Sequence, residues 1–130
     1  MRKSDPSIYG DKAQHLGRIL TAERNSGRRL WRLHTKTLVE NGNPVLFVGG
    51  RLDHAASDEF ERAALRHASL ADKNVIIDLS GVDYLSSSAL AIFQFLADRQ
   101  SQHGGRLQLR APSVAARLVL ELSGLEALIE

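Results

Sequence analysis

The apolar positions of the chain fall into short continuous runs and longer helical stripes. Residues 45–48 and 75–77 are continuous apolar runs between turn residues, a pattern typical of strands covered on both faces. Two other segments are rich in β-formers or alternate between apolar and polar residues, and they also favour strands. The expected strands are 30–39, 45–48, 74–79 and 106–110.

Three segments instead carry apolar residues at the three- and four-residue spacing of helices. Asp58, Glu59 and Glu61 crowd the first turn of one segment, where the helix dipole favours negative charge. Gly104 and Gly124 stand where the other two would end, as glycines commonly do after helices. The expected helices are 57–71, 86–102 and 113–123.

The order of these elements predicts the α/β class. Asn41-Gly42 between the first two strands is typical of a hairpin turn, and strands separated by helices imply right-handed parallel crossovers. We expect a single domain at residues 29–130, with a mixed, mostly parallel sheet of about four strands flanked by helices. Residues 1–28 are expected to be a basic N-terminal extension, partly helical or disordered, with an amphipathic helix at 11–24.

Composition narrows the class of protein. The chain has 130 residues, 43% hydrophobic and 25% charged, so one globular domain can form without disulfide or metal staples. It has no cysteine, which excludes disulfides, a cysteine nucleophile, thiolate-bound zinc and iron–sulfur clusters. Its longest apolar run is about five residues, whereas a spanning helix needs about 20. No secretory signal pattern is present, and we expect a cytoplasmic protein.

Charge is divided unevenly along the chain. Residues 1–36 hold nine Lys/Arg and three Asp/Glu, while residues 37–130 hold eight and twelve. Such a basic arm could contact nucleic acid, an acidic partner, a membrane surface or a second copy in a homodimer, or it could be a solvated extension. It lacks interleaved aromatic residues and any Lys/Arg run longer than two, so we expect no direct nucleic-acid binding.

The sequence carries no recognisable catalytic, metal or cofactor motif. The five histidines lack metal-ligand spacing, and the serines at 86–88 are not part of a Gly-x-Ser-x-Gly elbow. Asp53 and Asp78 both end predicted strands and could share a cleft, but two acids alone do not define a hydrolase. We therefore expect no enzyme activity, no metal and no cofactor.

The unusual segment is 78–90, which places Ser86, Ser87 and Ser88 where a strand gives way to a helix. Two interpretations remain open. Serine is a preferred helix N-cap, because its oxygen accepts a free backbone N–H. A phosphate on one of these serines would be favoured by the helix dipole and would add about −1.5 to −2 charges to a neutral patch.

This segment resembles the signature of the STAS family, the sulfate-transporter and anti-sigma-factor-antagonist domain, which reads Asp-Leu-Ser-Gly-Val, three variable residues and Asp-Ser-Ser-Gly-Leu. Residues 50–53 resemble the family's Gly-x-Leu-Asp, and residues 112–125 resemble its closing helix. The three motifs follow the family's order over about residues 30–129. Ser86 replaces the family's Asp, and Ala89 replaces its Gly. The short final strand and helix of many members are expected to be missing.

The resemblance implies an anti-sigma factor antagonist, a bacterial regulator of transcription that acts by partner switching. Its partners would be a serine kinase that is also the anti-sigma factor and binds the ATP, and a serine phosphatase. Ser88 is the implied phosphorylation site, with Ser87 as the alternative, and Asp53 matches a family acid near that serine. A second function remains open, a constitutive, unphosphorylated scaffold subunit of a signalling or membrane lipid-transport complex.

Helical spacing locates the expected partner surface on the helix that contains Ser88. Ser88, Ala91 or Ile92, Phe95 and Arg99 should share one face, while the more apolar face packs on the sheet. Phe95 is either an exposed anchor for a partner or packs in the core or under the N-terminal segment. The expected partner-binding residues are Asp53, Ser86, Ser87, Ser88, Ala89, Ile92 and Phe95.

Overall fold

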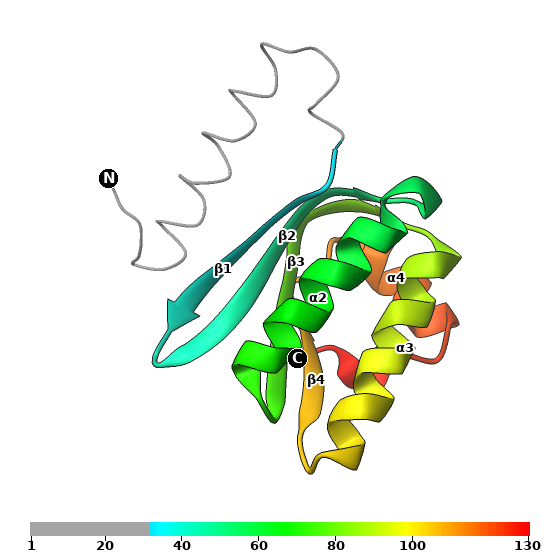
Figure 1. Cartoon of the computed structure of the whole chain (residues 1–130). Helices are drawn as coiled ribbons and strands as arrows, with labels where there is room; N and C mark the ends of the chain where they lie inside the picture. The colour runs from blue at the N-terminus through cyan, green and yellow to red at the C-terminus, as the bar shows by residue number, and fades with distance from the viewer. Residues whose placement is uncertain (1–31) are drawn as a thin grey trace. The chain divides into compact units, whose positions relative to one another are not determined.

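The computed structural model describes residues 32–130, which form a four-stranded mixed sheet flanked by helices (Figure 1). The strands, in their order across the sheet, are β1 (His34–Glu40), β2 (Asn43–Leu52), β3 (Asn74–Leu85) and β4 (Arg106–Arg110). β1 is antiparallel to β2, and β2, β3 and β4 are parallel. The expected α/β class and mixed sheet are confirmed. The extension 1–28, with its expected helix at 11–24, lies outside the described residues.

The hairpin between β1 and β2 has the turn that its sequence predicts. Glu40 pairs with Asn43, so the loop consists of two residues. Asn41 and Gly42 have φ of 52° and 83°, the left-handed values that a type I′ turn requires at both central positions. Such a turn matches the twist of the two strands and brings Leu38 opposite Val45.

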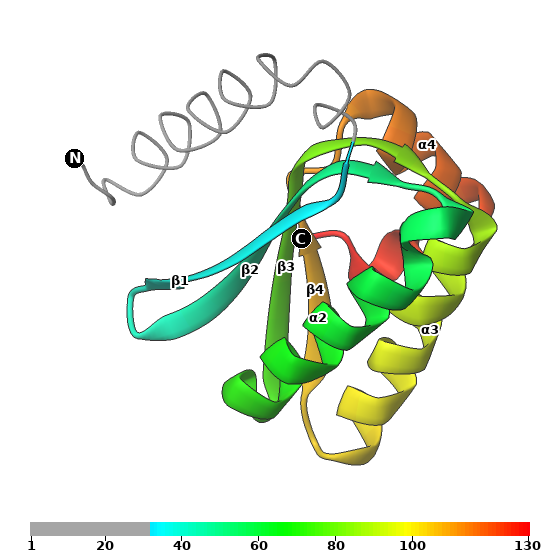
Figure 2. The same ribbon diagram turned by 45° about the horizontal axis from the view of Figure 1, so that its top comes forward.

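The helices α2 (Ser57–Ala71) and α3 (Ser87–Gln102) are the two crossovers of the parallel sheet. Figures 1 and 2 show them side by side on one face of it. Between them and the sheet, the fully buried rings of Phe60 and Phe93 meet edge-on with centroids 5.6 Å apart. The third helix, α4 (Val114–Leu122), follows β4 and packs against β3. The expected limits of α2 and β4 are confirmed.

The expected ends of β2 and β3 are wrong, because the glycines there are not turns. β2 continues through Gly49 and Gly50, and β3 continues through Gly81 to Leu85. A Cβ on Gly81 would lie 3.0 Å from the Gly49 Cα, so the absence of side chains lets the strands come close where their register shifts. Both strands therefore reach further toward the helix starts that follow them.

After α4, residues 123–130 form a 3₁₀ turn and a single bridge position, and they contain no full strand or α-helix. After the 3₁₀ turn η3 (Glu126–Leu128), Ile129 forms a parallel bridge with Leu109 of β4. The Glu130 backbone N–H donates to the Leu109 carbonyl at 2.9 Å. The bridge adds one hydrogen-bonded position at the β4 edge of the sheet.

Candidate functional site

The predicted site lies where β2 and β3 end side by side, at the carboxyl edge of the parallel sheet. β2 leads into the 3₁₀ turn η2 (His54–Ala56) and then α2, and β3 leads into α3. The Ser86 backbone N–H donates to the Leu52 carbonyl at 2.8 Å, which joins the two strand ends. This edge is where open α/β sheets commonly place their functional residues.

Ser86 is a structural cap of α3. It is 8% exposed, has an extended backbone, and its Oγ accepts the Ala89 N–H at 3.3 Å. This is the hydrogen bond that an N-cap serine makes with a free donor of the first turn. Ala89 is 1% exposed and belongs to the core. Ser86 and Ala89 are therefore beside the groove described below but contribute no surface to it, unlike the expectation for a partner contact.

Ser88 contacts a histidine from the other strand end. Its Oγ lies 2.7 Å from Nδ1 of His54, a residue 34 positions earlier in the chain. The backbone of His54 is fixed on both sides. Asp53 caps η2 by accepting the Ala56 N–H at 3.0 Å, and the Ser57 hydroxyl donates to the His54 carbonyl at 2.7 Å. Asp53, expected as a partner contact, thus holds the turn from which His54 reaches Ser88.

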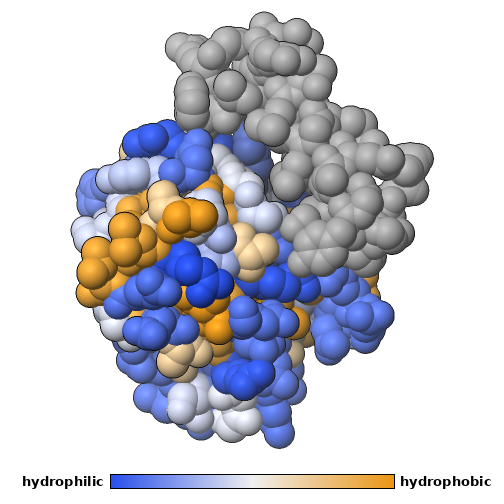
Figure 3. Space-filling view, turned by 180° about the vertical axis from the view of Figure 1, so that it is seen from behind, coloured by the Kyte–Doolittle hydropathy of each residue, from blue (hydrophilic) through white to orange (hydrophobic). Residues whose placement is uncertain are grey.

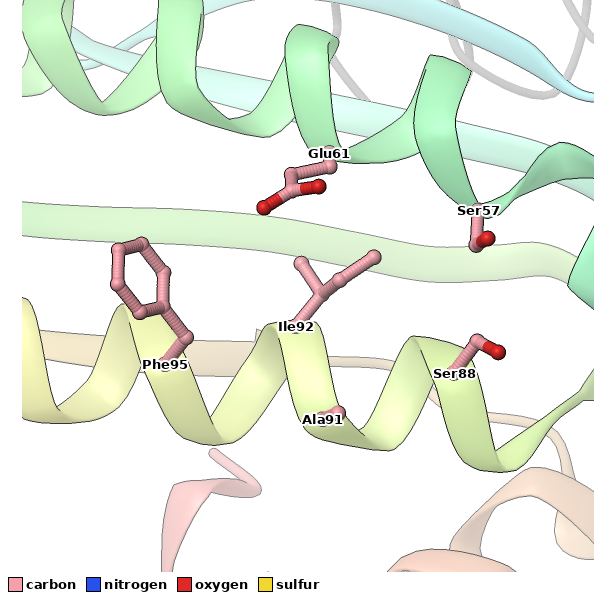
Figure 4. Close-up of a pocket in the computed structure, with 6 residues that line it drawn as sticks. All are labelled: Ser57, Glu61, Ser88, Ala91, Ile92 and Phe95. Atoms are coloured by element: carbon pink, nitrogen blue, oxygen red, sulfur yellow. The ribbon is translucent and has the colours of Figure 1, made fainter.

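A shallow groove of about 370 Å³ runs between α2 and α3 next to this pair. Figure 4 shows Ser57 and Glu61 of α2 facing Ser88, Ile92 and Phe95 of α3 across it. Phe95 is 51% exposed, so it is not a core residue. Ala91 and Ile92 both contribute to the groove, whereas Arg99 does not line it. The expected exposed face of α3 therefore forms one wall of a groove.

Two side chains of this groove, Ser57 and Glu61, and the neighbouring His54 are not among the sequence-predicted site residues. Ser57 and Glu61 are four residues apart at the start of α2, a spacing that places polar side chains on one face of a helix. That signal was available in the sequence. The contact of His54 with Ser88 spans 34 residues and depends on the alignment of two strand ends, which no local pattern indicates.

Asp78 lies in a different polar cluster, so the expected cleft shared with Asp53 is wrong. Arg110 on β4 donates to Asp78 on β3 at 3.0 Å and forms two hydrogen bonds to Glu40 on β1, at 2.8 and 3.0 Å. Burial by itself lowers the pKa of Arg110, but its hydrogen bonds to Glu40 and Asp78 outweigh this and raise its pKa above the ordinary value. The guanidinium also lies over the Phe47 ring, 5.6 Å from its centroid. With Phe47 on β2, these contacts of Arg110 join all four strands of the sheet.

A separate apolar stripe lies on α4. Val114, Leu118 and Leu122 follow one another at four-residue spacing and are 89%, 54% and 79% exposed. Figure 3, which views the molecule from behind, shows apolar surface gathered on its left side, over α4. Within residues 32–130, no helix is both long and apolar enough to cross a membrane. No group of three potential metal ligands occurs in that part of the chain.

Comparison with known proteins relates the chain to one family. The family model described as "Mlab, STAS domain" matches residues 37–130. A STAS-domain containing protein of Pseudomonas aeruginosa is 29% identical over 83 residues, which cover 64% of this chain and 81% of that protein.

Solved structures of anti-sigma factor antagonists share the fold. One from Mycobacterium paratuberculosis is 25% identical with a TM-score of 0.66, over 75% of this chain and 82% of that one. The antagonist SpoIIAA in its unphosphorylated form is 21% identical with a TM-score of 0.63, over 75% and 85%. The Bacillus SpoIIAA in its phosphorylated form has a TM-score of 0.58 at 21% identity, over 75% and 88%.

Proposed function

The chain belongs to the STAS domain family, and we propose that it is a protein-binding regulator that acts as an anti-sigma factor antagonist by partner switching. The observation that carries this proposal is the position of Ser88. Ser88 lines one end of a groove between α2 and α3 that also contains the half-exposed ring of Phe95 (Figure 4). A modification of Ser88 would therefore act directly on the surface that a partner covers.

Phosphorylation of Ser88 would change this surface electrostatically. It adds about −1.5 to −2 charges next to the apolar side chains of Ile92 and Phe95, in a groove that already contains the carboxylate of Glu61. A partner that buries the groove would have to desolvate that charge next to the carboxylate of Glu61, a cost of several kcal/mol. The phosphorylated form would release the partner.

The proposed partners are a serine kinase that also serves as the anti-sigma factor, and a serine phosphatase that restores the free hydroxyl. The kinase would bind the ATP, and this chain would supply only the acceptor. Ser87 is exposed and is the alternative acceptor. The proposed contact surface consists of Ser57, Glu61, Ser87, Ser88, Ile92 and Phe95. We propose a cytoplasmic location, because the sigma factors that such a kinase controls act there.

Affinity capture with three baits tests the proposal. Wild type, Ser88→Asp and the control Ser101→Asp are incubated with native lysate, and captured proteins are identified by mass spectrometry. Ser101 is an exposed serine near the other end of α3, so its substitution adds the same charge to the same helix. We expect wild type and Ser101→Asp to capture a serine kinase and Ser88→Asp to lose it. Equal capture by all three baits would contradict partner switching at Ser88.

The second candidate function is a constitutive scaffold subunit of a signalling or lipid-transport complex. One observation favours it: a separate exposed apolar stripe lies on α4, away from Ser88. Under this alternative, the same non-kinase partner would be recovered with all three baits, and Ser88 would be unmodified in protein purified from the native cell.

A further inference from the structure

Among the three serines at the start of α3, Ser88 is distinguished by its neighbour. The Ser86 hydroxyl accepts the Ala89 N–H and is buried. Ser87 is exposed, and its hydroxyl makes no hydrogen bond to the residues that the structure describes. The Ser88 Oγ lies 2.7 Å from a basic nitrogen, Nδ1 of His54, within the range in which a general base takes a proton.

The backbone that carries His54 is held in place by hydrogen bonds. Asp53 and Ser57 fix the backbone of the turn on either side of His54, as described above. The backbone hydrogen bond from Ser86 to Leu52 fixes the distance between the two strand ends. His54 lies two residues after Leu52, and Ser88 lies two residues after Ser86, so the imidazole and the hydroxyl both follow the joined strand ends.

We infer that His54 is the proton acceptor of Ser88 during its phosphorylation, an inference that rests on the proposed function. In the tautomer that carries its proton on Nε2, the imidazole accepts the Ser88 hydroxyl hydrogen at Nδ1. The Ser88 Oγ then attacks the γ-phosphorus of a nucleoside triphosphate bound by the kinase. The Oγ–P bond forms, the bond between the γ-phosphorus and the β–γ bridging oxygen breaks, and the nucleoside diphosphate leaves with that oxygen. The proton stays on Nδ1.

The proton that His54 takes from Ser88 partly neutralises the charge of the phosphorylated product. His54 becomes an imidazolium next to a phosphate that carries about two negative charges, so the two groups form an ion pair within this chain. The base therefore belongs to the substrate protein and not to the kinase. The role of Asp53 is that of a positioning residue, because it acts on Ser88 only through the turn that contains His54.

The test measures phosphorylation of purified protein by an extract of the source cells with γ-³²P-labelled ATP. The variants are His54→Gln, which keeps a polar side chain that does not take up a proton, and the control His103→Gln. His103 is an exposed histidine after α3, and its Nδ1 lies 2.7 Å from the Arg99 carbonyl oxygen. His103→Gln therefore makes the same chemical change at a histidine outside the site. Ser88→Ala identifies the labelled residue. Thermal unfolding and kinase capture verify that His54→Gln folds and binds.

We expect His54→Gln to lower the maximal labelling rate about 100-fold or more without changing the half-saturating concentration, and His103→Gln to match wild type. A wild-type rate for His54→Gln would overturn the inference and leave the proposed function intact. A raised half-saturating concentration at an unchanged maximal rate would also overturn it, since His54 would then be a contact for the kinase. If wild type is labelled no more than Ser88→Ala, both the phosphorylation switch and this inference fail.

In the isolated protein, the histidine ¹⁵N spectrum gives a second readout. We expect Nδ1 of His54 to resonate as a hydrogen-bond acceptor in wild type and to shift in Ser88→Ala, while His103 stays unchanged. An unchanged His54 signal in Ser88→Ala would show that the two side chains do not meet in solution, and it would overturn the inference without reference to any kinase.

Discussion

Phe95 and Phe93 provide a matched test of the proposed binding groove. They are two residues apart on α3, but Phe95 is 51% exposed and Phe93 is fully buried against Phe60. Truncation of each to alanine removes the same atoms from two different environments. We expect Phe95→Ala to weaken partner binding with a modest loss of stability, and Phe93→Ala to lower stability strongly.

The magnitude follows from the exposed fraction. A Phe side chain has about 200 Å² of apolar surface, so an exposed half presents about 100 Å² to a partner. At about 25 cal/mol per Å², its burial in a complex contributes about 2.5 kcal/mol, or about 70-fold in affinity. The buried half of the Phe95 side chain stabilises the folded state by a similar amount, which Phe95→Ala removes. Alanine has the better helix propensity, and this restores about 0.5 kcal/mol of the lost folding free energy. Phe93→Ala should cost about 3–5 kcal/mol of folding free energy.

Titration calorimetry with the captured partner and urea unfolding measure the two quantities. The expected result is a loss of about 70-fold in affinity for Phe95→Ala with a fold that still unfolds cooperatively. An affinity within about twofold of wild type would refute the assignment of the groove as the partner surface. A stability loss for Phe95→Ala equal to that for Phe93→Ala would show that Phe95 belongs to the core in solution.

Three further predictions concern the scaffold of the site. Ser86→Ala should lower the free energy of unfolding by about 1 kcal/mol in urea titrations and leave kinase capture unchanged, because the Ser86 hydroxyl caps α3 and contributes no surface; loss of capture would place Ser86 in the interface. Burial lowers the pKa of His67, so below about pH 6.5 the unfolded chain binds a proton that the native state excludes. Stability should therefore fall between pH 7 and 5, and urea unfolding of His67→Leu should show a smaller fall; an identical fall would assign it to other groups. A Cβ on Gly105 would lie 1.8 Å from the Lys73 carbonyl oxygen, so Gly105→Ala should cost at least about 2 kcal/mol by thermal unfolding, and a wild-type melting temperature would contradict this.

The sequence predicted the elements whose signals are local. The Asn41-Gly42 turn, the acidic first turn of α2 and the serine cap of α3 each act within four or five residues, and all three are present in the structure. The strand ends at Gly49 and Gly81 were misjudged because a glycine in a turn and a glycine at a close strand contact have the same local sequence. Only the pairing of β2 with β3 distinguishes them.

The candidate site was predicted only in part, because some of its contacts follow from local sequence and others depend on strand pairing. Ser88, Ile92 and Phe95 share a face through helical spacing, and the structure brings them to one groove. His54 was missed because its contact with Ser88 depends on the register of two parallel strands. The ion pair of Arg110 with Glu40 spans 70 residues and was missed on the same ground.

Two residues differ from the STAS signature, Ser86 in place of Asp and Ala89 in place of Gly, and both are buried rather than at the surface of the site. Aspartate and serine are both preferred N-caps, so Ser86 keeps the cap of α3 while removing a negative charge from the neighbourhood of Ser88. The methyl group of Ala89 points into the core, where it does not obstruct a partner. A neutral Ser86 repels an incoming phosphoryl group less than a carboxylate would, and His54 supplies a base beside the acceptor hydroxyl. The two substitutions are therefore compatible with the proposed phosphorylation switch at Ser88, because both residues are buried and neither adds a side chain to the groove.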